Sequence, residues 1–589
     1  MKRLYTIILI LLLTACTGTQ SPELIEEQIP TIPPEWLTRP PTPEITRQSG
    51  GQQVVQGLEP PATASLEPLT TIENETPEAT ISPTITPIFK LPDLFGRSWT
   101  ISADPGVPQE ITSTAQALAA ERPDDFIWVE PGSLPTDLTL TLDGQEPLGD
   151  WLYVVAAPFA TVEDEISESE LKALWSSSKA EDRSLLLKPP VSAYLREIWG
   201  EPGVNVEIED SEDLVDALWA QRPSLTVLPF QELRPDLKVL RLNGETPFDP
   251  GFSSEEYPLQ SAVGLDGEQE ALAAFLGAWA GQKTNFDPNK LTTVAMTGVT
   301  ALVRATATQM EIDGITSPGV DVGPVLRAAD FAHISNEVSF TPDCPEPNPV
   351  GGTSFCSQDE YFELLTDIGT DIIELTGNHL NDWGAEYVGR TIDMYEAAGI
   401  DYFGGGRDAK DAKRAAIIEH NGNRIALVGC NFFGPVYAWA TETSAGSRAC
   451  ESDFEDQIAQ LKADGYVVIA TQQYTEYYQY PPMPDQVRDF QAIADAGVSA
   501  VSGSQGHHAQ GFDFHNGAFI HYGLGNLFFD QMDMMGTRQA FVDIYSIYDG
   551  RLVNVNLWTG LIENYSTPRT MTTAERQDTL QTVFEASGW

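Results

Sequence analysis

The chain has 589 residues, 41% of them hydrophobic, and its 86 acidic and 33 basic residues give a formal net charge of −53. This length exceeds what one hydrophobic core supports, so we expect two or three domains. The charge argues against nucleic acid and against anionic lipid surfaces as electrostatic partners. An acidic surface keeps a protein soluble and does not by itself identify a substrate.

The first sixteen residues predict a targeting segment. Lys2 and Arg3 form a basic start, and residues 4–13 form an apolar run that is too short to span a bilayer as a stable helix. The run ends in Leu-Thr-Ala-Cys at Cys16, which resembles a bacterial lipobox, whose cysteine is acylated after cleavage. We expect an extracytoplasmic protein held to the cell membrane by lipid on Cys16. A plain secretory signal with an incidental cysteine is the alternative.

Residues 17–93 predict a tether. They are rich in Pro, Thr, Ser, Glu and Gln and contain few apolar clusters. Such a composition cannot bury enough surface to offset the entropy of ordering, and proline keeps the segment extended. We expect this segment to hold the folded domains away from the lipid.

Residues 97–285 alternate between short strand and helix patterns, which predicts an α/β domain. Ser167 to Glu170 reads as a capping box that opens a helix. The runs WLYVVAAPF and VLPFQELRPDLKVLRLNGETP resemble a two-lobed periplasmic substrate-binding-protein domain of the phosphate or molybdate type. That resemblance implies a ligand between two lobes. The segment contains no histidine or cysteine, which argues against soft-metal binding or thiol catalysis there.

A second α/β pattern covers residues 290–562, and all seven histidines of the chain lie after residue 330. The strands in it are rich in Val, Ile, Leu and Ala, as in sheets covered on both faces. We predict strands at residues 291–296, 331–335, 371–375, 424–428, 466–470, 498–501 and 518–522.

Polar side chains follow these strands repeatedly. The stretch 371–382 reads DIIELTGNHLND, so a buried strand ends in Asn378 and His379, with Asp382 three residues later. Glu337 follows the strand before it, and His507 and His508 follow a later one. Because ligand groups collect at the carboxyl ends of strands in α/β folds, we expect one site at this sheet edge. The alternative is that each residue is a helix cap or turn.

The motifs GVTALVR, SNEVSF, TGNHLNDWG, YFGGGRDAKDA, QGHHAQGF and HYGLGNLFFD together resemble the CapA family of poly-γ-glutamate capsule synthesis proteins. The resemblance covers residues 290–562 and leaves residues 563–589 as a C-terminal tail. It implies a calcineurin-like metallophosphatase fold, a β-sandwich flanked by helices. It also implies a metal site at the strand ends and a role in making, anchoring or trimming an anionic exopolymer with the capsule-synthesis machinery.

Carried over residue by residue, the resemblance assigns the metal-ligand positions to Glu337, Asn378, His379 and His507. It leaves room for one divalent ion, Mn, Zn or Fe, or for none. Asp382 or His508 would move protons, although His508 neighbours His507 on an extended chain and would point to the opposite side.

Other positions depart from the family pattern. Val299 stands where a metal-binding carboxylate is expected. Gln472 or Gln473, and also Gln505, stand where imidazoles are expected. Two-metal phosphoesterase chemistry needs a bridging carboxylate and several imidazoles. Valine offers no lone pair, and amide oxygens are weak neutral ligands.

The remaining cysteines form an even set in the second domain. Loop length favours disulfides Cys344–Cys356 and Cys430–Cys450, although four cysteines permit three pairings. Disulfides fit an exported protein. A cysteine metal cluster is the rival reading, against which the sequence shows no Cys-x-x-Cys.

Three functions remain open on these grounds. The first is a non-catalytic relative whose former metal site binds polymer or serves assembly. The second is a single-metal hydrolase that cleaves an amide or phosphate ester in an extracellular polymer. The third is a solute receptor that acts through the first domain.

Overall fold

The computed structural model describes residues 98–132, 135–210 and 213–589. The predicted signal segment with Cys16 and the tether at 17–93 lie outside the described residues. In the described part of the chain, no helix combines the length and the apolar character needed to cross a membrane.

The N-terminal domain, residues 99–278, is built on a mixed sheet with the strand order β2-β1-β3-β11-β4-β8-β6-β7, and β9 pairs with β4. The observed elements confirm the predicted alternation of strands and helices. They are β1 (Trp99–Ala103), α1 (Gln109–Glu121), β2 (Phe126–Trp128), β3 (Leu138–Leu142), β4 (Glu146–Pro158), β5 (Glu165–Ile166), α2 (Glu168–Ser176), β6 (Ser184–Leu187), α3 (Pro189–Trp199), β7 (Val206–Ile208), α4 (Leu214–Ala220), β8 (Ser224–Pro229), β9 (Leu237–Val239), β10 (Arg241–Leu242), β11 (Gln260–Gly267) and α5 (Gln269–Ala278).

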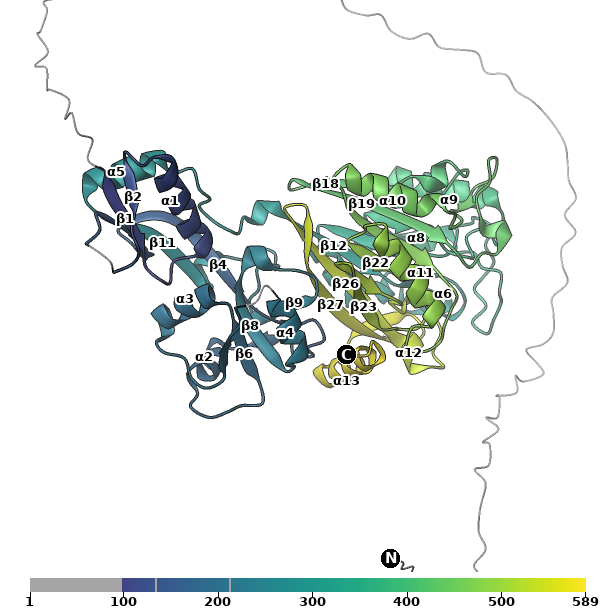
Figure 1. Cartoon of the computed structure of the whole chain (residues 1–589). Helices are drawn as coiled ribbons and strands as arrows, with labels where there is room; N and C mark the ends of the chain where they lie inside the picture. Colours follow the sequence, from purple (N-terminus) through teal and green to yellow (C-terminus); the bar gives the residue numbers. More distant parts are fainter. Residues whose placement is uncertain (1–97, 133–134, 211–212) are drawn as a thin grey trace, which may run out of the picture. The chain divides into compact units, whose positions relative to one another are not determined.

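The long strand β4 joins the two halves of this domain. Its first half pairs antiparallel with β11, and its second half pairs with β8 and β9 (Figure 1). The predicted capping box is present at the start of α2, where Ser167 and Glu170 cap each other's backbone. The domain is thus two groups of strands and helices that share one strand.

The C-terminal domain, residues 291–586, contains two large sheets. One has the order β16-β15-β14-β12-β26-β27-β28, with β13 and β25 attached, and the other has the order β18-β19-β21-β22-β24-β23. The strands are β12 (Leu291–Thr297), β13 (Val299–Thr300), β14 (Phe331–Asn336), β15 (Ile372–Glu374), β16 (Asp401–Phe403), β18 (Ala416–His420), β19 (Asn423–Asn431), β21 (Val467–Gln473), β22 (Ala500–Ser502), β23 (Phe512–His515), β24 (Ala518–His521), β25 (Asn526–Phe528), β26 (Gln539–Tyr548), β27 (Arg551–Glu563) and β28 (Thr567–Thr570). A small pair, β17 (Gly405–Gly406) and β20 (Gly446–Ser447), lies apart.

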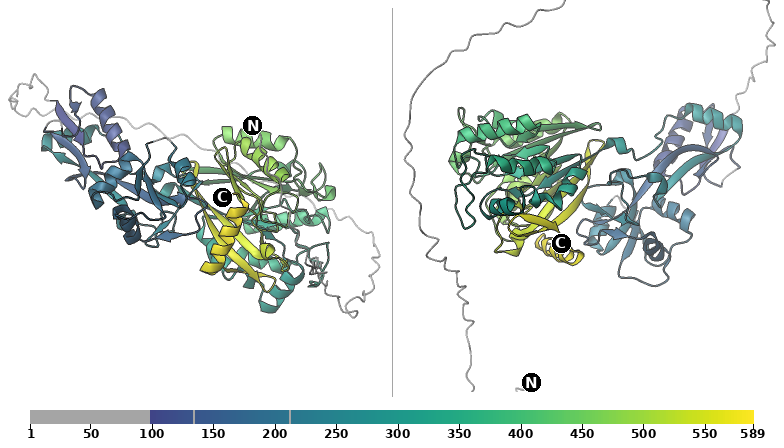
Figure 2. Two further views of the ribbon diagram at one scale, coloured as in Figure 1. Left: turned by 60° about the horizontal axis from the view of Figure 1, so that its bottom comes forward. Right: turned by 180° about the vertical axis from the view of Figure 1, so that it is seen from behind.

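Helices accompany both large sheets (Figures 1 and 2). They are α6 (Arg304–Asp313), α7 (Val322–Ala328), α8 (Phe362–Asp367), α9 (Ala385–Ala398), α10 (Asp453–Ala463), α11 (Pro484–Asp495), α12 (Met535–Arg538) and α13 (Thr573–Ala586). Side chains of α7, α8 and α9 pack on the outer face of the first sheet, and those of α10 and α11 pack on the second. The seven predicted strands all correspond to observed ones, whereas the sequence did not predict the long hairpin of β26 and β27.

The two sheets pack face to face around a shared apolar core. This core contains Val294 and Tyr545 from the first sheet and Ile425, Ile469 and Phe519 from the second. Alternate residues of each strand face this core or the outer helices, as the two-residue period of a strand requires.

Toward the carboxyl ends of the strands, the residues that face the interior are polar and no longer apolar. Fully buried hydrogen bonds connect the sheets there: Ser504 Oγ donates to Glu374, Gln505 Nε2 donates to Ser335 Oγ, and His521 Nδ1 lies 2.7 Å from Asp543 Oδ2. Burial alone would raise the pKa of Glu374, but hydrogen bonds from His333, Ser504 and Thr376 lower it below its ordinary value. The interior therefore grades from apolar to polar along the strand direction.

Residues 563–589, which the sequence analysis set apart as a C-terminal tail, contain a strand and a helix that join the domain. Residues 567–570 form β28, which pairs with β27, and α13 follows it. Leu580, Val583 and Phe584 of α13 lie in the sandwich core, and both figures show the helix against the yellow strands. Apolar residues at helical spacing account for this packing.

Gly503 marks a close approach of two backbone segments. A Cβ atom at this position would lie 2.0 Å from the carbonyl oxygen of Tyr522. We predict that Gly503→Ala lowers the free energy of unfolding of this domain by about 1–3 kcal/mol, because overpacking forces the backbone apart. The Tm from scanning calorimetry measures the effect.

Gly389 provides the matched control. It lies within α9, where an added Cβ meets nothing within 4 Å. Gly389→Ala should raise stability by roughly 0.5–1 kcal/mol, since alanine favours the helix. Equal Tm values for the two variants would contradict the account of Gly503.

Candidate functional site

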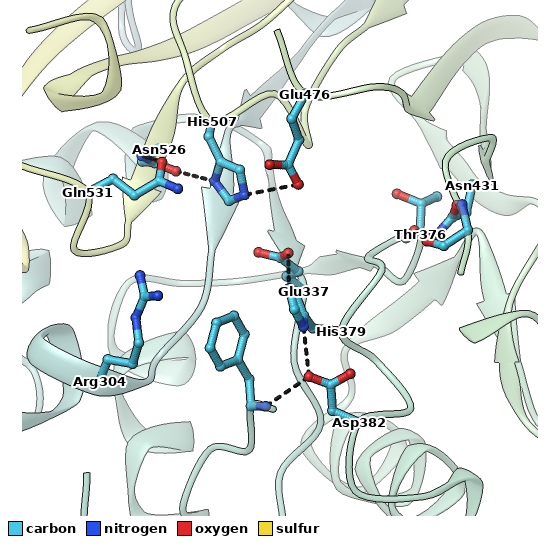
Figure 3. Close-up of polar contacts among 12 residues, drawn as sticks. Arg304, Glu337, Thr376, His379, Asp382, Asn431, Glu476, His507, Asn526 and Gln531 are labelled. Carbon is cyan, nitrogen blue, oxygen red and sulfur yellow. Dashed lines mark hydrogen bonds and ion pairs between the residues drawn. The ribbon is translucent and has the colours of Figure 1, made fainter. Parts of the chain in front are cut away.

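The candidate site lies at the carboxyl ends of parallel strands. β14 pairs in parallel with β15, and β19, β21, β22 and β24 run parallel in the other sheet. Glu337 follows β14, and Asn378 and His379 follow β15. Glu476 follows β21, and His507 follows β22. The predicted convergence of polar side chains at one edge is therefore present, and Figure 3 shows its central residues.

His379 is oriented by Asp382. The Nδ1 atom of His379 lies 2.7 Å from Asp382 Oδ2, which also accepts a hydrogen bond from the backbone N–H of Phe355. The other ring nitrogen, Nε2, lies 3.8 Å from Glu337 Oε1. Burial would lower the pKa of His379, but the hydrogen bond to Asp382 and the charge of Glu337 raise it above its ordinary value.

His507 is oriented in a similar way by an amide. Its Nδ1 atom lies 2.7 Å from Asn526 Oδ1, and the Nδ2 group of Asn526 donates to the carbonyl oxygen of Thr537. Nε2 of His507 lies 3.7 Å from Glu476 Oε1. Glu476 also accepts a hydrogen bond from Tyr478 Oη.

Glu337 lies between the two imidazoles. Its side chain is 1% exposed, and its Oε2 atom has no hydrogen-bond partner among the described residues. Burial raises the pKa of Glu337, and the charges of His507 and His379 oppose this rise. Figure 3 shows its carboxyl group directed toward the His507–Glu476 pair.

An aromatic stack connects the two histidines on one side. His379 packs on Phe355 with ring centroids 4.2 Å apart, and His507 packs on Phe529 at 5.1 Å. The guanidinium of Arg304 lies over both phenyl rings, 5.1 Å from Phe355 and 4.6 Å from Phe529. We call these five residues the ring stack.

Arg304 has unusual backbone geometry for a residue other than glycine. Its φ is 49°, in the left-handed region, and its guanidinium pairs with Asp530, which also caps α6 through the N–H of Ala305. Such a conformation costs free energy and persists only where the surroundings impose it. The pairing with Asp530 supplies that constraint.

The comparisons with known proteins bear on this domain. Residues 293–531 match the model of a family described as bacterial capsule synthesis protein PGA_cap. We call residues 293–531 the CapA-like region because they match this family model, and the strand-end residues of the site lie within it.

Two curated relatives are similar to the CapA-like region. The Bacillus anthracis capsule biosynthesis protein CapA is 31% identical over 180 residues, which is 30% of this chain and 44% of that protein. The Bacillus subtilis PGA biosynthesis protein CapA is 25% identical over 214 residues, 36% of this chain and 56% of that protein. The chain thus spans about half the length of the curated relatives it matches.

Solved structures give weaker likenesses. A possible phosphate binding protein from Planctomyces limnophilus has a TM-score of 0.26 at 12% identity and covers 31% of this chain and 87% of its own. The Haemophilus influenzae NAD nucleotidase has a TM-score of 0.29 at 10% identity, covering 50% of this chain and 56% of its own. Scores of this size assign neither a ligand nor an activity.

The CapA-like region does not fit the metal centre that the resemblance implied. Across residues 98–589, apart from the four undescribed positions, no group of three or more His, Cys, Asp or Glu residues could hold a metal ion. Each imidazole faces its own carboxylate. Val299 is buried without a donor atom, and Gln505 is engaged with Ser335. Gln472 faces the other way, toward Cys450 on the helix side of β21.

The structure separates His508 from the site, contrary to the prediction that it moves protons there. Its Nδ1 atom lies 2.6 Å from the carbonyl oxygen of Ala509, and its ring packs against Tyr480 and Gly536. The alternation of side chains along an extended segment places His507 and His508 on opposite sides. Asp382, the other predicted proton carrier, contacts His379 directly.

The structure contains the disulfides Cys344–Cys356 and Cys430–Cys450. The first holds a loop beside the site, because Phe355 of the ring stack directly precedes Cys356. The second joins the end of β19 to the segment before α10.

Sequence reasoning missed Glu476, Arg304 and the two phenylalanines of the ring stack. Glu476 lies within the aromatic run at 474–480, which follows a predicted strand and could have drawn attention to it. Most tyrosines of that run pack on the domain, and Tyr474 and Tyr477 donate to Asp489 and Asp485. Arg304 ends the motif GVTALVR, but that motif did not mark it as a site residue.

The pairing of His379 with Asp382 predicts a titration. The folded protein binds the His379 proton more tightly than the unfolded chain does. This contribution to stability is therefore present below the unfolded pKa and is lost as pH rises through the raised pKa. We predict that Asp382→Asn lowers the pKa of His379, measured from the imidazole resonances in NMR spectra.

Asp495→Asn is the matched control, because Asp495 pairs with the surface residue His515 at 2.8 Å. That change should leave the His379 titration in place. An unchanged His379 midpoint in Asp382→Asn would show that the hydrogen bond does not set its pKa.

Proposed function

We propose that this protein is an accessory factor for an anionic exopolymer of the poly-γ-glutamate type at the outer face of the cell membrane. It binds the polymer and supports its synthesis or anchoring, and it does not hydrolyse it by two-metal chemistry. Lipid on Cys16 attaches it to the membrane, and the segment at 17–93 acts as the tether. The names of the relatives, which include capsule biosynthesis and PGA biosynthesis proteins, support the polymer class.

The proposal rests on which side chains stand at the metal-ligand positions at the strand ends. Two-metal hydrolysis needs ligands that converge on ions about 3.5–4 Å apart. In the CapA-like region these positions hold Val299, which has no donor atom, and Gln505, whose Nε2 group donates to Ser335 and whose amide oxygen is a weak neutral ligand. A site with these substitutions keeps its shape and its hydrogen-bonding groups but lacks the metal ligands.

The N-terminal domain supplies a second recognition element in this proposal. Its two groups of elements around β4 support the predicted likeness to a two-lobed substrate-binding protein, and its alternating strands and helices fit that class. Its contribution is binding of polymer or of an assembly partner.

A hydrolase is the second candidate, favoured by one observation. Asp382, His379 and Glu337 form a line in which a carboxylate orients an imidazole toward a buried carboxyl group. Such a line can carry a proton. The cleavage test below separates this candidate from the first.

The proposal is tested by asking whether the protein binds poly-γ-glutamate without cleaving it. The purified full chain is mixed with poly-γ-glutamate, and complex formation is followed by sedimentation while chain length is followed by size-exclusion chromatography. We expect co-sedimentation with unchanged polymer length, both in chelator and after addition of Mn²⁺ or Zn²⁺. Polymer shortening that His379→Gln abolishes would establish the hydrolase instead.

Metal analysis gives an independent check. We expect the purified protein to retain no stoichiometric Mn, Zn or Fe, and its Tm to stay the same when these ions are added, because no ion bridges folded-state ligands. A metal-dependent rise in Tm that Glu337→Gln removes would contradict the proposal.

A further inference from the structure

Hydrogen-bond acceptors predominate among the atoms that face the centre of the candidate site. Asp382 Oδ2 accepts from Nδ1–H of His379, so Nε2 is the ring nitrogen that presents a lone pair when the proton leaves the ring. Asn526 uses its Nδ2 group on Thr537, so its Oδ1 accepts from Nδ1–H of His507 and leaves Nε2 of that ring as an acceptor too. Both acceptor nitrogens face carboxyl groups at 3.7–3.8 Å, too far for a direct hydrogen bond.

Two buried oxygen atoms in the segments that follow β14 and β15 lack partners. Within the described residues, Glu337 Oε2 and Asn378 Oδ1 make no hydrogen bond, although Glu337 is 1% exposed and Asn378 is 7% exposed. Leaving a buried acceptor unpaired costs free energy, so these atoms indicate a ligand that donates. Glu476 adds a further acceptor oxygen from the opposite side.

A cationic group with several N–H bonds is complementary to this arrangement. Metal ligands must approach an ion to ~2.0–2.2 Å, whereas N–H···O bonds span ~2.7–3.2 Å and need a wider space. Each imidazole faces a separate carboxyl group, which suits the longer contacts. The net charge of −53 also favours a cation over an anion at this site.

We propose that the site formed by Glu337, Asn378, His379, Glu476 and His507 binds a primary ammonium group. This inference rests on the proposed function and deepens it. A chain of γ-linked glutamate carries carboxylates along its length and one ammonium group, at its amino end. The protein therefore recognises the end of such a polymer, where the repulsion between carboxylates and its own acidic surface is least.

Two sources present this chemistry. One is the amino end of a γ-glutamyl chain, where a carboxylate lies next to the ammonium, and the other is the side-chain amine of a lysine-type residue in a peptide. Arg304 distinguishes them, because its guanidinium lies one ring away from each histidine in the ring stack. Its Nε and Nη2 atoms engage Asp530, so Nη1 is the donor that can pair with the adjacent carboxylate.

Calorimetric titration of the full chain tests the proposal with three ligands. These are a γ-linked glutamate oligomer with a free amino end, the same oligomer acetylated at that end, and Nα-acetyl-lysine amide. We expect the free oligomer to bind at least roughly tenfold more tightly than the acetylated one, since several charge-assisted hydrogen bonds are lost on acetylation. Weak binding of the lysine derivative then identifies the polymer end, and equal binding identifies a side-chain amine.

Variants of the acceptor residues complete the test. Glu337→Gln and Glu476→Gln should each weaken binding of the free oligomer by roughly tenfold. Glu363→Gln removes the same charge from the exposed surface of α8 and should change nothing. Glutamine matches glutamate in shape at the buried position. If Glu337→Gln nevertheless fails to fold, Glu476, whose side chain is 23% exposed, carries the test.

Three results would overturn the ammonium site: equal affinity for the free and acetylated oligomers, no binding of any amine, or stoichiometric binding of Mn²⁺ or Zn²⁺ that Glu337→Gln abolishes. The polymer co-sedimentation experiment is independent of these titrations. Co-sedimentation without any preference for amines removes the ammonium site and leaves the accessory function standing, whereas loss of co-sedimentation removes the accessory function itself.

Discussion

The C-terminal domain depends on satisfying polar groups that are buried between its two sheets. At the amino-terminal end of the strands, apolar residues such as Ile425 and Phe519 fill the interior without any such demand. At the other end, Glu374 and Asp543 are fully buried, and each has a histidine partner. A buried charge without a partner costs several kcal/mol. The contacts that cross between the sheets, Ser504 with Glu374 and His521 with Asp543, therefore fix how the sheets face each other. The site lies just beyond this polar layer.

Sequence periodicity predicted much of this architecture, because strand and helix spacing depends on local pattern. The seven strands that end near the site and the helices between them were predictable from runs of Val, Ile and Ala. The hairpin of β26 and β27 was not, since no functional motif drew attention to it. The C-terminal tail was expected to carry no role, whereas Leu580, Val583 and Phe584 of α13 lie in the core. Contacts between residues that lie far apart in sequence determine both the β26–β27 hairpin and the packing of α13.

The site was predictable in its members and less so in its geometry. Glu337, Asn378, His379 and His507 do gather at one edge, as parallel strands require. Which nitrogen of each histidine is available depends on Asp382 and Asn526, and only the first of these lies close in sequence to its histidine. Glu476 lies in a loop and Arg304 is the first residue of α6, and no periodicity encodes how loops and helix ends are placed. The substitutions at Val299 and Gln505, by contrast, were visible in the sequence and explain the absence of a converging metal-ligand set in the described residues.

The ring stack links ligand binding at the site to the stability of the whole domain. The ring stack consists of residues from separate segments that are spread over more than two hundred residues of sequence, namely Arg304, Phe355, His379, His507 and Phe529. The unfolded chain therefore contains no partial version of the site. A ligand held there binds only the folded domain, so by mass action it stabilises the whole sandwich and not one loop. The polymer that we propose as its ligand would then prolong the folded lifetime of the protein that binds it.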